Sequence, residues 1–135
     1  MNFLRRLFSK KQSFPNIVVG KVLDIQKHPN ADRLRLIKVD VGGKIIEPIV
    51  CGAFNFGVGD MVVLALPGAN IAQNVHDKAH KPFVLQKATI RGIESQGMIC
   101  AAFELGLGPL SEKPEIMLLK SHIKSGSQFY PEMVR

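Results

Sequence analysis

The sequence predicts an all-β domain, a small barrel or sandwich, on the strength of three observations. Apolar and β-branched residues gather in short runs at regular spacing between residues 17 and 101. Turn-forming pairs such as Gly42-Gly43 and Pro67-Gly68 separate these runs. After the first dozen residues, no long segment shows the 3.6-residue apolar period of a helix. A chain of 135 residues fits one domain, whose core must be mainly aliphatic because Trp is absent.

The first half of the chain is expected to supply four strands. They are the apolar, β-branched runs at residues 17–25, 34–41, 45–51 and 61–66. The turn cluster His28-Pro29-Asn30 ends the first run, and Gly42-Gly43 joins the second and third as a hairpin. Pro48 interrupts the third run and has no backbone N–H to donate, which predicts an edge strand or a bulge there.

The second half is expected to be less regular. Residues 69–82 are polar and predict a long loop or a ragged hairpin. Residues 83–90 and 96–101 predict further strands. A single helical turn is expected at residues 103–105, and the apolar residues after position 115 predict a short additional strand or helix.

The N-terminus differs from the rest of the chain and predicts a basic amphipathic arm over residues 1–16. Apolar and basic side chains alternate there at helical spacing, and Pro15 ends the pattern. The apolar stripe consists of Phe3, Leu4, Leu7 and Phe8, flanked by Arg5, Arg6, Lys10 and Lys11. Four functions remain open for this arm: an anionic membrane surface, a protein partner, RNA phosphates, or a frayed terminus. The expected organisation is therefore an arm at 1–16, a domain at 17–108 and an extension at 109–135.

The distribution of charge limits what the net charge of +7 implies. Residues 1–16 carry four basic residues and no acid, whereas residues 17–110 carry ten Lys and Arg against eight Asp and Glu. A basic balance favours a polyanionic partner, but here most of the excess lies in the arm, so solubility explains it equally well. No run approaches the roughly 20 apolar residues of a membrane span, and no secretory signal is visible. A cytoplasmic protein is expected, with Cys51 and Cys100 as buried, reduced thiols.

The residues offer no combination that supports catalysis. His76 and His80 have the i, i+4 spacing of zinc ligands, but they lie in a polar stretch that Pro82 closes, which favours a solvated loop. No nucleophile elbow is present, and Gly57 and Gly59 do not open the helix that a phosphate-binding loop needs. We therefore expect a binding module with no catalytic residue, no metal site and no cofactor.

A set of short motifs, taken together, identifies a family resemblance. They are His28-Pro29-Asn30-Ala31-Asp32-Arg33-Leu34, Lys38-Val39-Asp40-Val41-Gly42, Ile49-Val50-Cys51-Gly52-Ala53 with Asn55, Gly57 with Gly59-Asp60, Leu66-Pro67-Gly68-Ala69, Ile90-Arg91-Gly92 with Glu94-Ser95 and Gly97-Met98, and Glu104-Leu105-Gly106-Leu107. In this order they resemble the tRNA-binding OB domain of phenylalanyl-tRNA synthetase beta chains, also found appended to methionyl-tRNA synthetases and as stand-alone proteins. The resemblance implies a five-stranded OB-fold Greek-key barrel. The block at 51–55 and the block at 104–107 favour the phenylalanyl-synthetase-like branch.

The resemblance also implies where RNA binds. It places the Ser-x-Gly-Met loop and nearby basic residues on the tRNA-facing surface, namely Lys38, Asn55, Lys87, Arg91, Ser95 and Met98. Ser95 can donate to and accept from a phosphate or a 2′-hydroxyl, whereas Met98 is as readily a core residue. The block at residues 28–32 is interpreted as structural, with a solvent-facing His28 and Arg33 as candidate contacts.

The expected function is non-catalytic binding of folded tRNA through phosphate and shape contacts. Stacking of bases is not expected, because Phe54, Phe56, Phe83 and Phe103 are each as readily core residues. The alternative is a protein-docking or assembly module, synthetase-associated or chaperone-like, with little affinity for RNA. The resemblance implies tRNA, an aminoacyl-tRNA synthetase and a second copy in a homodimer as partners.

Overall fold

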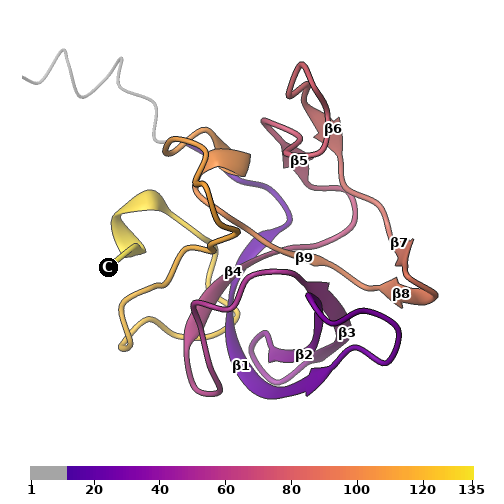
Figure 1. The fold of residues 1–135 in the computed structure, drawn as a ribbon. Coiled ribbons are helices and arrows are strands. Elements are labelled where there is room, and N and C mark those ends of the chain that lie inside the picture. The colour runs from indigo at the N-terminus through magenta and orange to yellow at the C-terminus, as the bar shows by residue number, and fades with distance from the viewer. Residues whose placement is uncertain (1–11) are drawn as a thin grey trace, which may run out of the picture.

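The computed structural model describes residues 12–135, so most of the arm expected at 1–16 lies outside the described residues. Five strands form one antiparallel sheet that curls into a barrel, seen nearly end-on in Figure 1. The strands are β1 (Ile17–Lys27), β2 (Arg35–Asp40), β3 (Ile45–Cys51), β4 (Met61–Ala65) and β9 (Met98–Ile99), in the order β3-β2-β1-β4-β9. The all-β class and the five-stranded OB-like barrel are therefore confirmed.

Strand β4 is buried along its whole length because both of its faces are covered. Val62 and Leu64 face the barrel interior, where they pack with Val22, Ile37 and Ile49. The alternate residues of β4 pack against a second cluster on the opposite face, which includes Phe129 from the C-terminal segment. This two-sided burial explains why β4 is a continuous apolar run rather than an alternating one.

The barrel closes between β3 and the residues before β9 through single hydrogen bonds instead of a ladder. The backbone N–H of Gln96 donates to the carbonyl of Pro48 (2.9 Å), and the N–H of Val50 donates to the hydroxyl of Ser95 (2.9 Å). Strand β3 is an edge strand, and its pairing with β2 shifts register between Ile37 and Val39, opposite Pro48. The edge and the bulge expected from Pro48 are both confirmed.

The long connection between β4 and β9 forms two hairpins, visible at the top and right of Figure 1. Strands β5 (Asn70–Ile71) and β6 (Phe83–Val84) pair in the first, and β7 (Ala88–Ile90) and β8 (Ile93–Ser95) pair in the second. The single strand expected at 83–90 was therefore wrong, because Leu85 still pairs with Ala69 before the chain turns away.

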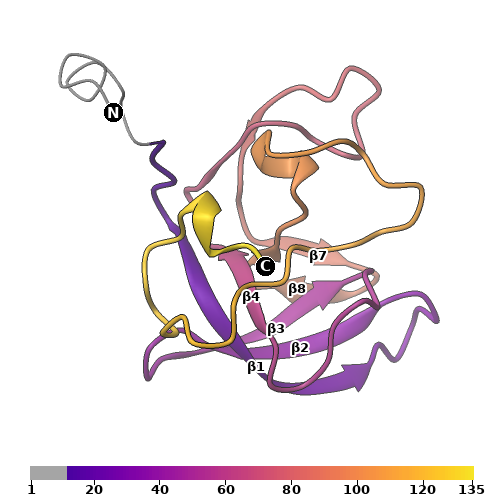
Figure 2. The same ribbon diagram turned by 90° about the vertical axis from the view of Figure 1, so that its left-hand side faces the viewer.

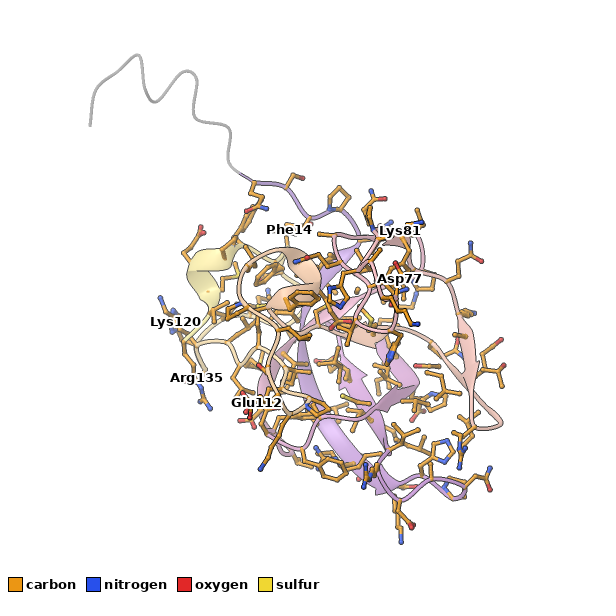
Figure 3. All side chains as sticks on the ribbon, turned by 45° about the horizontal axis from the view of Figure 1, so that its top comes forward. Phe14, Asp77, Lys81, Glu112, Lys120 and Arg135 are labelled. Carbon is orange, nitrogen blue, oxygen red and sulfur yellow. The ribbon has the colours of Figure 1, made fainter. Side chains whose placement is uncertain are left out.

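The C-terminal segment packs on the outer face of β1 and β4. Two single 3₁₀ turns, η1 (Phe103–Leu105) and η2 (Pro131–Met133), flank it, and η1 confirms the expected helical turn. Phe129 is fully buried and meets Phe14 edge to face, with ring centroids 5.3 Å apart. In Figure 3, Lys120 and Arg135 mark this side of the molecule, away from Asp77 and Lys81 on the β5–β6 hairpin. The boundary expected at residue 108 stays a prediction.

Candidate nucleic-acid interface

The turn between β7 and β8 presents Arg91 to solvent in a fixed geometry. Arg91 has a φ of 52° and Gly92 a φ of 90°, so this two-residue hairpin loop has both central residues in the left-handed region, as in a type I′ turn. Asn and Gly are the usual residues in such a turn, and a long side chain is uncommon there. The hairpin therefore holds a cation at its tip at some cost in backbone strain.

The conformation of this turn is held by the loop between β1 and β2. The Nε2–H of His28 donates to the carbonyl of Ile90 (3.1 Å), and its Nδ1 accepts from the backbone N–H of Asn30 (3.0 Å). The side-chain amide of Asn30 donates to the carbonyl of Arg91 (3.0 Å). His28 is 1% exposed, so the expectation that it faces solvent was wrong: both ring nitrogens serve this clamp. Arg33, in the same loop, is exposed as expected.

Lys87 and Arg91 are both exposed and stand on the same hairpin arm. Within residues 12–135 neither of them forms a salt bridge, so their charges are available to an anion. Lys38 lies apart from them on the outer face of β2, where its ammonium group meets the carboxylate of Glu47 at 3.3 Å. Asp24 lines the same shallow cavity of about 130 Å³, so acidic neighbours partly compensate the charge of Lys38.

The other three predicted site residues are engaged within the fold. The hydroxyl of Ser95 accepts from Val50 and donates to the carbonyl of Gly97 (2.9 Å), and the side chain is 4% exposed. The side-chain amide of Asn55 pairs with both backbone groups of Ile116, each at 3.0 Å. Met98 lies in β9, half-buried against the core. The structure thus places Lys87 and Arg91 at the two ends of β7 and leaves Asn55, Ser95 and Met98 with structural contacts.

An apolar groove of about 790 Å³ runs between the end of β3, η1 and residues 109–117. Figure 2 shows the segment after η1 arching away from the barrel. Glu104 lies in this groove, where burial raises the pKa of its carboxyl although the N–H of Ala101 donates to it at 2.8 Å. Burial likewise raises the pKa of the Cys51 thiol in the wall and, more strongly, that of Cys100. Both thiols are reduced and buried, as expected.

Sequence reasoning named Phe54 as one of four candidate aromatic residues but did not identify it as the exposed one at the end of the barrel. The guanidinium carbon of Arg35 lies 4.5 Å from the ring centroid of Phe54 and 4.7 Å from that of Phe56. Phe56 is buried, whereas Phe54 is 55% exposed. Phe54 and Phe56 lie two residues apart on the loop after β3, and the sequence gave no pattern that distinguishes the core residue from the exposed one. The deciding contact comes from Arg35, on another strand.

The histidine pair at 76 and 80 forms no metal site in the part of the chain that the structure describes. Among residues 12–135, no three His, Cys, Asp or Glu side chains are grouped closely enough to hold an ion. His80 instead packs its ring edge against Phe103, with centroids 5.0 Å apart. No helix within the same residues is long and apolar enough to cross a bilayer.

Comparison with known proteins gives a family match across most of the chain. A family model described as "Putative tRNA binding domain" matches residues 17–128. The chain is 47% identical over 107 residues to a phenylalanine–tRNA ligase beta subunit of Wolinella succinogenes, covering 79% of this chain and 12% of the relative. It is 40% identical over 131 residues to the same subunit of Dehalococcoides mccartyi (strain ATCC BAA-2266), covering 95% and 16%. The chain thus spans only about 12 to 16% of the length of these relatives.

Two solved structures share the fold. A MetRS-related protein from Pyrococcus horikoshii superposes with a TM-score of 0.59 at 17% identity, covering 96% of this chain and 98% of that one. The C-terminal domain of Plasmodium vivax p43 superposes with a TM-score of 0.55 at 24% identity, covering 84% and 58%. At these identities the likeness shows the fold alone.

Proposed function

We propose, from the premise that this chain belongs to the tRNA-binding domain family, that it binds folded tRNA through phosphate and shape contacts and carries out no catalysis itself. The observation that carries the proposal is the exposed cation Arg91 on a turn that His28 and Asn30 clamp. Because the backbone of this turn is already held in place, it loses little freedom when Arg91 meets a phosphate, so more of the contact energy remains as affinity.

The position of the hairpin supports this role. OB folds bind nucleic acids on the face of their second and third strands, between the loops that flank it. Here the β1–β2 loop holds the Arg91 turn, and Gln96, just after the hairpin, bonds to Pro48 on β3. The β7–β8 hairpin therefore borders β2 and β3, and it carries Arg91 at its turn and Lys87 just before β7. In this proposal they contact phosphates, and Lys38 contributes less because Glu47 compensates its charge.

Asn55, Ser95 and Met98 have a different role in this proposal. Their polar atoms and apolar surface are used within the fold, so they shape the surface without supplying the main contacts. Phosphate contacts position a nucleic acid without reading its sequence. We therefore expect binding to many tRNAs with similar affinity.

A titration with bulk tRNA at several salt concentrations tests this proposal. Replacing both Lys87 and Arg91 with Ala should weaken binding about tenfold and reduce the salt slope by about 2, one unit for each lost phosphate contact. Lys120→Ala is the matched control, since that exposed cation lies on the C-terminal side of the molecule, away from the hairpin (Figure 3), and should change neither quantity. Absence of wild-type binding in the micromolar range at low salt would overturn the proposal.

The apolar groove favours a second candidate function, docking of a protein partner. Its apolar walls carry three carboxylates, Glu104, Glu112 and Glu115, and the one cation Lys113. A basic, apolar segment of an aminoacyl-tRNA synthetase would complement it. Retention of such a partner from nuclease-treated lysate, lost on Glu112→Lys with Glu115→Lys, would favour this candidate, whereas loss after nuclease treatment alone would favour RNA. The homodimer stays an expectation, to be checked by light scattering.

A further inference from the structure

We propose that Phe54 is a stacking platform for an unpaired nucleobase of the bound RNA. The inference rests on the proposed tRNA binding and adds the RNA feature that is recognised, a base outside a helix. It reverses the expectation from the sequence that stacking plays no part. Base stacking on aromatic side chains is a common means by which OB folds hold single strands.

The ring of Phe54 has one occupied face and one open face. The guanidinium of Arg35 lies over it at 4.5 Å, and the ring remains 55% exposed. Arg35 is itself held by Phe56 beneath it and by hydrogen bonds from its Nη2 to the carbonyls of Ala53 (3.1 Å) and Phe56 (3.2 Å). The column of Phe56, Arg35 and Phe54 is therefore fixed before any ligand arrives.

The charge beneath the ring favours a base above it. A cation on one face draws π density from the ring, and an electron-rich base then stacks more favourably on the opposite face. Covering the exposed ring with a flat base also removes apolar surface from water. A nucleobase satisfies both requirements, whereas an aliphatic side chain satisfies only the second.

The β1–β2 loop links the Arg91 turn to the segment that carries Phe54. Asn30 bonds to Arg91 at one end of that loop, and the N–H of Leu34 bonds to the carbonyl of Ala31 within it (3.4 Å). At the other end, a Cβ built on Gly52 would lie 3.7 Å from the carbonyl oxygen of Arg33. Gly52 is two residues before Phe54, so the backbone of the β1–β2 loop connects the Arg91 turn to the segment that carries Phe54, and Arg91, Arg33 and Phe54 are all exposed. Cations that track a backbone beside an aromatic platform are the usual combination for unpaired RNA.

Two substitutions at position 54 test the proposal. Phe54→Leu keeps an apolar side chain and removes the ring, and it should weaken binding of bulk tRNA and of an unstructured oligoadenylate of about 12 nucleotides by roughly tenfold. A duplex RNA of about 16 base pairs, which offers no free base, should bind the variant as well as it binds the wild type. Val58→Ala is the matched control: Val58 is an equally exposed apolar residue on the same loop, and its loss should leave all three affinities unchanged.

The second substitution reports stacking directly. The chain contains no Trp, so Phe54→Trp places the single tryptophan of the protein at the platform, where its emission can be followed separately from that of Tyr130. Its emission should be quenched as tRNA or oligoadenylate saturates the protein and should stay constant with the duplex. Thermal melts that match the wild type would show that both variants fold, as expected for an exposed side chain.

The outcomes separate this inference from the proposed function. Wild-type affinity of Phe54→Leu for tRNA, or unquenched emission of Phe54→Trp at saturation, would overturn the stacking platform. If the Lys87→Ala, Arg91→Ala variant still loses affinity in that case, tRNA binding stands without stacking. If the wild-type protein binds no RNA at all, both proposals fail together. If Phe54→Leu loses as much affinity for the duplex as for tRNA, Phe54 has a structural role, and this result would also overturn the inference.

Discussion

Ser95 is the residue on which the barrel closes. Its hydroxyl accepts from the N–H of Val50 on β3 and donates to the carbonyl of Gly97, next to β9. One side chain thus satisfies two backbone groups at a seam where no ladder forms. A serine at this position is explained by the fold before any ligand is considered.

Ser95→Ala should therefore destabilise the fold more than it weakens RNA binding. The substitution leaves the buried N–H of Val50 without a partner, which costs about 1–3 kcal/mol, and the melting temperature should fall by roughly 4 to 15 °C. Calorimetry measures the melting temperature, and a tRNA titration well below it measures affinity, which should stay within about twofold because the hydroxyl is buried. The opposite result, an unchanged melting temperature with a large loss of affinity, would place the hydroxyl on the RNA.

The sequence predicted the exposed site residues better than the buried ones. The family resemblance implied surface positions for Lys87 and Arg91, Arg33 was expected to face solvent in its turn, and all three are exposed, as long cationic side chains usually are. His28 and Ser95 were expected to face solvent or ligand, but they bond to partners 62 and 45 positions away along the chain. Residue type alone does not reveal a hydrogen bond across the fold, so polarity was a poor guide to exposure.

In the β7–β8 hairpin, the residue that supplies the positive charge, Arg91, also strains the backbone of the turn. Its turn has two left-handed residues, a geometry that Asn-Gly adopts readily and Arg-Gly does not. The hydrogen bonds from His28 and Asn30 to the carbonyls on either side offset part of this strain. Strained backbone held by its surroundings is a recurring feature of functional sites.

Arg91→Asn should stabilise the hairpin and weaken tRNA binding in the same protein. Asn tolerates the left-handed region, so the free energy of unfolding should rise by about 1 kcal/mol, while loss of the cation removes one unit of the salt slope. Denaturant unfolding and salt-dependent titration measure the two effects. Arg91→Lys is the control, because it keeps both the charge and the strain and should change neither quantity by much. A variant that is more stable and binds equally well would exclude a role for the Arg91 charge.

Strands that coincide with long apolar, β-branched runs were predicted well, and short strands were not. The expected runs for β1 to β4 agree with the strands to within two residues, because β-branched residues fill a buried sheet. Strands β7 and β8 have three residues each and are paired mainly with each other. Their boundaries depend on the positive φ of Arg91, a conformation that the sequence does not indicate for an arginine.

At the scale of the whole molecule, the curled sheet has two apolar faces and needs cover on both. The barrel interior is filled mainly by β1 to β4, whereas residues 117–129 contribute Met117, Leu119 and Phe129 to the cluster that covers the outer face of β1 and β4. The side-chain amide of Asn55 holds the start of the C-terminal segment in place through its paired hydrogen bonds with Ile116. Isolated β-bridges at Val18–Gln128 and Val62–Leu118 add backbone contacts. The sequence did not show this, because the apolar residues of the segment have no strand or helix period of their own.

The fragment 12–108 should consequently fail to fold, although it contains all five strands of the barrel. Removing residues 109–135 uncovers Ile17 and Val63 and takes away Phe129, whose truncation to Ala alone would cost about 3–5 kcal/mol. The loss at Phe129 alone is therefore a large part of the free energy of unfolding of an ordinary small domain, which is about 5–15 kcal/mol. Thermal unfolding followed by circular dichroism should show a cooperative transition for residues 12–135 and none for 12–108, which should also bind a hydrophobic dye. A cooperative transition in 12–108 would instead support an independent domain ending at residue 108, with the C-terminal segment as a dispensable extension.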